Sequence, residues 1–263
     1  MQVELDGKVA LVCGASRGLG KACAAELARH RARVVICARD GVALRATARD
    51  IGSASAATVV PVVCDTSRAD DLARLVETTV AQLSSLDILV ANVGHPETGG
   101  FFDLAEDAWQ TGFEQILLAT VRLYQRVLPI MKARGWGRIV NIASSAIREP
   151  NSTYLLSGVF RSGSAWLSKA LANQFGRDDI TINTVCPGLF RTQLGKAILA
   201  TAAARQETSL ADAEADLAGL TAVGRIGEPE QLAGLVAFLC SDVAGHITGQ
   251  TITIDGGKAR GLF

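Results

Sequence analysis

Short apolar runs alternate with longer amphipathic segments along almost the whole chain. The apolar runs predict β-strands at 9–13, 33–37, 59–63, 87–90, 138–142, 180–185 and 251–254. The segments between them predict helices at 21–30, 42–51, 69–83, 113–134 and 155–175. Strands that are apolar throughout are typical of parallel sheets covered by helices on both faces. The regular alternation predicts an α/β fold, a doubly wound parallel sheet, in one domain spanning 1–263.

One polar, alanine-rich helical segment, 192–220, interrupts this alternation. It follows the strand predicted at 180–185, on the carboxyl side of the sheet. Ligands bind at that edge in open parallel sheets. We interpret the segment as a small helical lid over a substrate. The alternative is a helical excursion on the surface.

A glycine-rich turn links the first strand to the first helix. Its glycines are Gly14, Gly18 and Gly20. Glycine lets the backbone turn sharply and approach a ligand closely. The helix that follows directs free N–H groups and its positive dipole end at an anion. The turn therefore predicts a dinucleotide pyrophosphate site, and a merely structural strand–helix turn is the alternative.

Composition narrows the function classes. The chain has 263 residues, 49% of them hydrophobic, and a formal net charge of +0 at pH 7. Nucleic acids and acidic membranes select basic patches, so neither is an expected partner. The six cysteines form no C-x-x-C pair, and no metal-ligand spacing occurs. No apolar run approaches a membrane span of about 20 residues. The opening residues show no signal peptide, so a cytoplasmic protein is expected.

Several separate motifs occur along the chain in a fixed order. They lie at 14–20, 64–65, 91–94, 141–145, 187–188, 225–230, 247–250 and 255–257. Through them the chain resembles the classical short-chain dehydrogenase/reductase family, close to members similar to 3-oxoacyl-carrier-protein reductase. The resemblance implies a Rossmann-like, seven-stranded parallel sheet. It also implies a nicotinamide cofactor and a homotetramer or homodimer.

The end of the second strand bears on the choice of nucleotide. NAD enzymes usually carry an acidic residue there, bonded to the ribose 2′-OH. This chain has Ala38, followed by Arg39, and Arg17 lies within the glycine turn. Two guanidinium groups suit a 2′-phosphate. We therefore expect NADP(H) rather than NAD(H). Asp40 either neutralises Arg39 in part or begins the next helix.

The resemblance also implies which further residues line the nucleotide cleft. They are Ser16, Leu19, Asp65, Thr66, Asn92, Gly94, Arg161, Pro187, Gly188 and Thr192. Asp65 would bond the adenine, and its alternative role is to cap a strand end.

The family's catalytic set is Asn, Ser, Tyr and Lys, and three of its four positions depart here. Ser144 matches the serine. The family spacing places Ser157 at the tyrosine position and Arg161 at the lysine position. Ile116 stands at the asparagine position. The Ser-x-x-x-Arg form resembles a divergent branch of the family that also carries a (K/R)-x-P segment, here 148–150.

These substitutions change the available chemistry. A serine hydroxyl is a far weaker acid than a phenol, but Ser157 can still donate a hydrogen bond. Arg161 stays charged and can hold the nicotinamide ribose or stabilise an oxyanion. Tyr154 supplies a phenol from another angle if it is already helical, and otherwise packs at the helix start. His95 is either a neutral loop residue or an acid that faces the substrate.

Three functions follow from the sequence. The first is an NADP(H)-dependent oxidoreductase acting on a hydrophobic or acyl carbonyl or alcohol. The second is a reductase of an activated C=C bond, and the third is a nucleotide-binding subunit that has lost catalysis. The apolar substrate rests on four side chains that follow strand-end motifs and that can equally be core. They are Phe101, Phe102, Leu189 and Phe190.

Overall fold

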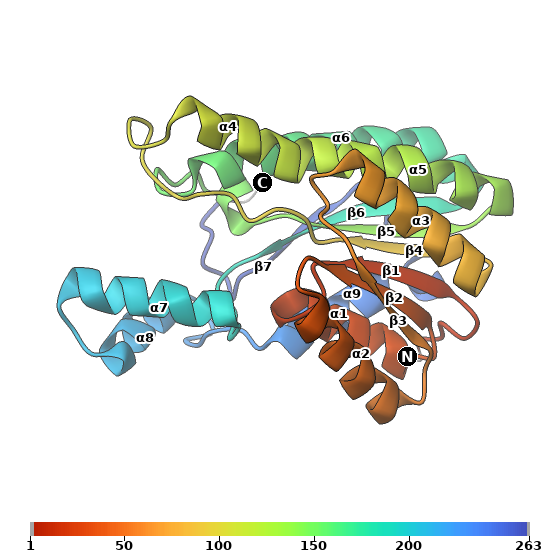
Figure 1. Ribbon diagram of the computed structural model, residues 1–263. Helices are drawn as coiled ribbons and strands as arrows, with labels where there is room; N and C mark the ends of the chain where they lie inside the picture. The colour runs from red at the N-terminus through yellow and green to blue at the C-terminus, as the bar shows by residue number, and fades with distance from the viewer. Residues whose placement is uncertain (1–2, 262–263) are drawn as a thin grey trace.

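Seven parallel strands form one central sheet (Figure 1). The computed structural model describes residues 3–261. The strands are β1 (Val9–Cys13), β2 (Arg33–Ala38), β3 (Val59–Val63), β4 (Ile88–Ala91), β5 (Gly137–Ile142), β6 (Ile180–Pro187) and β7 (Thr251–Ile254). Their order is β3-β2-β1-β4-β5-β6-β7. The predicted doubly wound, seven-stranded sheet is confirmed.

Helices cover both faces of the sheet, as Figure 1 shows. One layer consists of α1 (Gly18–Arg29), α2 (Gly41–Ser55) and α9 (Pro229–Leu239). The other consists of α3 (Ala69–Leu83), α5 (Ala119–Arg134) and α6 (Leu155–Phe175), with α4 (Glu106–Gly112) leading into α5. A π-helical turn, Phe113–Leu118, joins α4 to α5.

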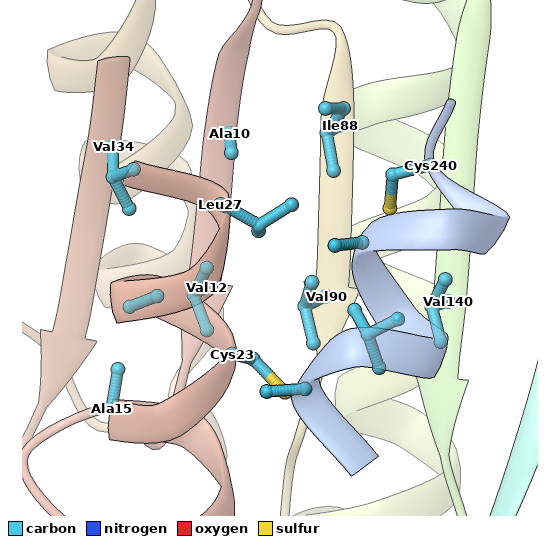
Figure 2. Close-up of a cluster of buried hydrophobic side chains, with 14 of the residues drawn as sticks. Ala10, Val12, Ala15, Cys23, Leu27, Val34, Ile88, Val90, Val140 and Cys240 are labelled. Atoms are coloured by element: carbon cyan, nitrogen blue, oxygen red, sulfur yellow. The ribbon is translucent and has the colours of Figure 1, made fainter. Parts of the chain in front are cut away.

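Helices α1 and α9 pack against each other and against the middle of the sheet (Figure 2). Cys23 of α1 lies beside Val90 of β4, and Leu27 lies between Ala10 of β1 and Ile88 of β4; Cys240, the C-cap residue of α9, belongs to the same buried cluster. All of these side chains are fully or almost fully buried. This packing fixes α1, whose N-terminus borders the glycine turn.

The strand order reverses between β1 and β4. From β1 the chain continues to β2 and β3 on one side, and β4 then starts the other half of the sheet. Loops that leave neighbouring strands in opposite directions open a crevice at the carboxyl edge, where ligands of such sheets bind. Cys13 of β1 and Ala91 of β4 therefore lead into the two banks of the candidate site.

The sequence misplaced several helix boundaries. The helix predicted at 113–134 begins earlier, at Glu106, and contains the π-helical turn. Helix α9 was not predicted at all. The segment predicted at 192–220 is a hairpin of two helices, α7 (Gln193–Gln206) and α8 (Leu210–Gly219). Between residues 3 and 261, no helix is long and apolar enough to span a membrane.

Candidate dinucleotide and active site

The glycine turn brings the backbone of three segments into very close contact. A Cβ on Gly20 would lie 2.3 Å from the carbonyl oxygen of Gly14. A Cβ on Gly14 would lie 2.7 Å from the carbonyl oxygen of Asn92. Real Cβ atoms do not approach so closely, so both positions require glycine. Side-chain-free backbone at this place can also approach a ligand.

The N-terminus of α1 has the features of an anion-binding site. Its N-cap residue, Arg17, makes no side-chain capping hydrogen bond, and the first turn holds no acidic residue. The first N–H groups of the helix therefore lack a side-chain partner at its positive dipole end. Together with the glycine cradle, this arrangement fits the pyrophosphate of a dinucleotide.

Two arginines are expected at the adenosine end of the crevice. Within residues 3–261, neither Arg17 nor Arg39 forms an ion pair, and Arg17 donates instead to Gln193, with 2.6 Å between Nη1 and Oε1. Asp40, the possible neutraliser of Arg39, caps α2. Its Oδ1 accepts from the N–H groups of Val42 at 3.0 Å and Ala43 at 3.1 Å. Asp40 therefore begins the helix, which is one of its two predicted roles.

We expect Asp40→Ala to lower the free energy of unfolding by about 1 kcal/mol, because two helix N–H groups lose their acceptor. Asp40→Asn is the matched control. It removes the same charge and keeps a capping oxygen, so its stability should equal that of the parent. Urea denaturation measures both. Equal stability of the Ala and Asn variants would show that the cap contributes nothing.

Asp65 and Asn92 also lie at strand ends of the crevice. Oδ1 of Asp65 accepts from the backbone N–H of Ser67 at 3.0 Å and from its hydroxyl at 2.8 Å. Asp65 thus caps its own turn. Nδ2 of Asn92 lies 3.4 Å from the carbonyl oxygen of Gly14, which ties the two banks of the crevice together.

Arg161 is the centre of the proposed catalytic end of the crevice. Its side chain is buried, with 8% of the residue exposed. Nη1 donates to the carbonyl of Ile142 at 2.8 Å, and Nη2 donates to those of Val93 at 3.1 Å and Gly94 at 2.8 Å. Nε donates to Oγ of Ser157 at 3.2 Å. Arg161 thus joins α6 to the segments that leave β4 and β5.

This guanidinium is charged at neutral pH. Burial lowers the pKa of Arg161 from 12.5 to about 10, which still leaves it protonated. Backbone carbonyl dipoles surround it. Partial burial together with the charges of Arg161 and Arg39 lowers the pKa of His95. His95 is therefore neutral at pH 7, as one of its two predicted roles requires.

Ser144 and Ser157 both accept a hydrogen bond and keep a hydroxyl hydrogen to donate. Oγ of Ser144 accepts from the backbone N–H of Ala146 at 3.2 Å. Oγ of Ser157 accepts from Arg161. Cys186, a buried thiol close to Ser144, has its pKa raised by burial to about 11. The thiol therefore stays protonated at neutral pH.

The structure also shows the surroundings of Ile116, at the family's asparagine position, and of Tyr154. Ile116 is fully buried, and its side chain packs so closely on Gly94 that a Cβ there would lie 2.5 Å from it. The carbonyl of Ile116 accepts from the Thr120 hydroxyl at 2.7 Å. Tyr154 is the N-cap of α6, outside the helix, and its backbone bridges to Gly99. Tyr154 is therefore not helical, which was the condition for it to share a helix face with Ser157.

Residues 187–192 lead from β6 into the helical hairpin. The N–H of Gly188 donates to the carbonyl of Ile254 at 3.0 Å, beside Pro187. Oγ1 of Thr192 caps α7 by accepting from the N–H of Gly195 at 3.0 Å. A Cβ on Gly18 would lie 3.6 Å from the Thr192 side chain, so this segment lies beside the glycine turn.

The four apolar side chains considered for the substrate pocket differ in burial, and Leu189 is partly buried. Phe101 and Phe102 are 65% and 96% exposed. Phe190 is core: only 5% is exposed, and its ring packs on Gly227. Gln193 was not singled out from the sequence, because its contact with Arg17 joins distant parts of the chain. The described residues hold no cluster of three side chains able to bind a metal ion.

The fold and the crevice define a dinucleotide-binding α/β protein, and comparisons with known proteins place it more closely. Residues 14–259 match the family described as "Enoyl-(Acyl carrier protein) reductase". Dehydrogenase/reductase SDR family member 4 of Bos taurus is 35% identical over 98% of this chain and 89% of its own length. The chain therefore belongs to the short-chain dehydrogenase/reductase family.

Solved structures of reductases are similar to this chain over its whole length. L-sorbose reductase from Gluconobacter frateurii, complexed with NADPH and L-sorbose, superimposes with a TM-score of 0.95 at 29% identity, covering 100% of both chains. A variant of actinorhodin polyketide ketoreductase with NADPH gives a TM-score of 0.92 at 30% identity, covering 99% of both chains.

Proposed function

We propose that this protein is an NADP(H)-dependent oxidoreductase that acts on a hydrophobic or acyl carbonyl or alcohol. The observation that carries the proposal is the glycine cradle at the uncapped N-terminus of α1, flanked by Arg17 and Arg39, neither of which has an acidic partner within residues 3–261. Ala38 at the end of β2 leaves room where an acidic residue would repel a 2′-phosphate. The NADPH-bound relatives support this choice.

Each part of the cofactor has proposed partners in the crevice. The cradle (Gly14, Ser16, Gly18, Leu19 and Gly20) would take the pyrophosphate, and Arg17 and Arg39 the 2′-phosphate. Asp65 and Thr66 would border the adenine. Asn92, Gly94, Pro187, Gly188 and Thr192 would line the remaining length. Arg161 has five N–H groups and uses four in the contacts above, so one is left for the nicotinamide ribose.

The proposed chemistry uses two hydroxyl groups and one fixed charge. NADP(H), when bound, supplies or accepts the hydride. The hydroxyls of Ser144 and Ser157 donate hydrogen bonds to the substrate oxygen. Arg161 acts as a positioning residue: its Nε–H occupies a lone pair of Ser157 and so turns the hydroxyl hydrogen toward the crevice. These donors and the nearby charge stabilise the alkoxide of the reduced substrate, and water supplies its proton.

Two alternatives remain as candidate functions. Reduction of an activated C=C bond is favoured by Ser157 in the tyrosine position, because such a reaction protonates carbon rather than oxygen. The matched family description, an enoyl reductase, also supports it. A nucleotide-binding subunit without catalysis is favoured by the departures at 116, 157 and 161.

We also propose a role for the hairpin of α7 and α8 and an assembly. The hairpin follows the carboxyl end of β6 and serves as a lid over the substrate. Resemblance to the family supports a homotetramer or homodimer.

Consumption of NADPH with panels of ketones, acyl thioesters and enoyl thioesters tests the function. We expect turnover with an apolar ketone or 3-oxoacyl substrate and an alcohol as product. A saturated acyl product would favour the C=C alternative. Tight cofactor binding without turnover of any substrate would favour the inactive subunit.

Tyr154→Phe tests the alternative proton donor. Because Tyr154 is an N-cap tied to Gly99 by its backbone, we expect kcat to stay within about threefold of the parent, far less than the 10²- to 10⁴-fold that a general acid contributes. Steady-state kinetics with the best substrate measures this. A loss of tenfold or more would make Tyr154, in place of water, the proton donor.

A further inference from the structure

One hydrogen bond connects the glycine turn to the lid hairpin. Nη1 of Arg17 donates to Oε1 of Gln193 at 2.6 Å, across a sequence separation of 176 residues. Gln193 is the first residue of α7. The preceding residue, Thr192, lies beside Gly18. The first turn of the lid is therefore held against the glycine turn.

The hairpin is otherwise anchored at its base. Arg191 pairs with Glu214 of α8 and, at 3.0 Å between Nε and Oε1, with Glu228 ahead of α9. The buried ring of Phe190 packs on Gly227, and the backbones of these two residues form a parallel bridge. Figure 1 shows α7 and α8 extending away from the sheet and its helical layers. Because the rest of the hairpin extends away from the sheet, the Arg17–Gln193 hydrogen bond can influence the orientation of α7 and α8.

The two proposed partners of Arg17, Gln193 and the 2′-phosphate, lie on opposite sides of it. Gln193 follows β6, and Arg39 follows β2. In the sheet, β2 lies on one side of β1 and β6 lies on the other, beyond β4 and β5. A 2′-phosphate held beside Arg39 would therefore draw the Arg17 side chain away from Gln193. A charge-assisted bond to a phosphate dianion is stronger than a bond to a neutral amide.

We propose that Gln193 competes with the 2′-phosphate of NADPH for Arg17, so that NADPH breaks the Arg17–Gln193 hydrogen bond and NADH leaves it in place. This inference rests on the proposed function, since it takes Arg17 as a ligand of the 2′-phosphate. Gln193 is then a specificity-determining residue that acts through another side chain. The lid responds to the correct cofactor before any substrate arrives.

Dissociation constants for NADPH and NADH test the competition. Gln193→Ala removes the competitor, so NADPH should bind about two- to tenfold more tightly, the range expected for one exposed hydrogen bond. NADH should bind within about twofold of the parent value on the same reasoning. Gln206→Ala is the matched control: it is the same substitution at the other end of α7 and should change neither constant.

Hydrogen exchange of the amides in 193–219 reports on the lid itself. In the parent protein, saturating NADPH should speed exchange in the first turn of α7 relative to saturating NADH. In Gln193→Ala the two complexes should exchange alike. Equal exchange in both complexes of the parent would overturn the proposal, and so would a Gln193→Ala variant that weakens both cofactors equally.

Arg17→Ala separates failure of this inference from failure of the proposed function. If Arg17→Ala leaves NADPH affinity unchanged, the 2′-phosphate role of Arg17 is wrong and the competition fails with it. If Arg17→Ala weakens NADPH while Gln193→Ala changes neither constant, the cofactor assignment stands and the competition alone is refuted.

Discussion

Arg161→Met is expected to lower kcat/KM by about 100- to 1,000-fold, the loss typical of removing one preorganised charge or donor from an active site. The variant loses the Nε–H that orients Ser157 and the charge beside the substrate oxygen. It also loses the three bonds to carbonyls at 93, 94 and 142, which fix the end of the crevice. Steady-state kinetics with the best substrate of the panel measures the effect.

Two controls separate chemistry from folding. Ser157→Ala leaves the carbonyl contacts of Arg161 intact, so it should stay folded and lose a large part of the same activity. Arg161→Lys restores a charge without the planar fork and should recover only part of the activity. If Arg161→Met folds and keeps the parent's kcat/KM, the charge has no part in catalysis.

The pKa of His95 gives a readout that a merely structural role would not move. The charge of Arg161 helps to lower this pKa, so Arg161→Met should raise it toward 6.5 in an NMR titration. The pKa of His95 is lower in the folded than in the unfolded chain, so its contribution to stability is lost as the pH falls below 6.5. The variant should therefore lose less stability in that range than the parent.

The double variant Arg17→Ala/Arg39→Ala should weaken NADPH binding by about 100-fold or more, since each charge-assisted bond is worth roughly 1.5–3 kcal/mol. NADH has no 2′-phosphate, so its dissociation constant should stay within about threefold, the scatter of small indirect effects. Isothermal titration measures both. The loss should diminish as salt is added, because exposed charges are screened.

Matched variants make this result specific. Arg49→Ala removes an exposed charge from α2, outside the proposed site, and should leave NADPH affinity unchanged. Ala38→Asp on the double variant supplies an acceptor for a ribose 2′-OH and should shift the preference to NADH. Equal weakening of NADPH and NADH by the double variant would mean that the two arginines do not read the 2′-phosphate.

Local patterns sufficed to predict the sheet, because the strands are short and rich in apolar and β-branched residues, as in Val9–Cys13. Helix α9 was missed because it is apolar on most sides and shows little periodicity. Its start carried a usable signal: Pro229 stands at the first turn, and Glu228 and Gln231 form a capping box. The π-helical turn near 113–118 has no comparable sequence marker.

The candidate site was predictable only where a short motif defines it. The glycine turn and Arg39 were identified from neighbouring residues in the sequence. The carbonyl partners of Arg161 were not, because backbone oxygens of strand ends carry no sequence signature. Gln193 meets Arg17 only through the tertiary fold. The substituted catalytic positions could be named by spacing, but the structure was needed to show Nε of Arg161 bonded to Ser157.

The most direct test of the account is the titration of the purified protein with NADPH and with NADH. NADPH is expected to bind about 100-fold more tightly than NADH or better, from two guanidinium contacts that NADH cannot make. Failure to bind either nucleotide, reduced or oxidised, would contradict it. The chain would then keep the fold of a dehydrogenase without its ability to bind a nicotinamide cofactor.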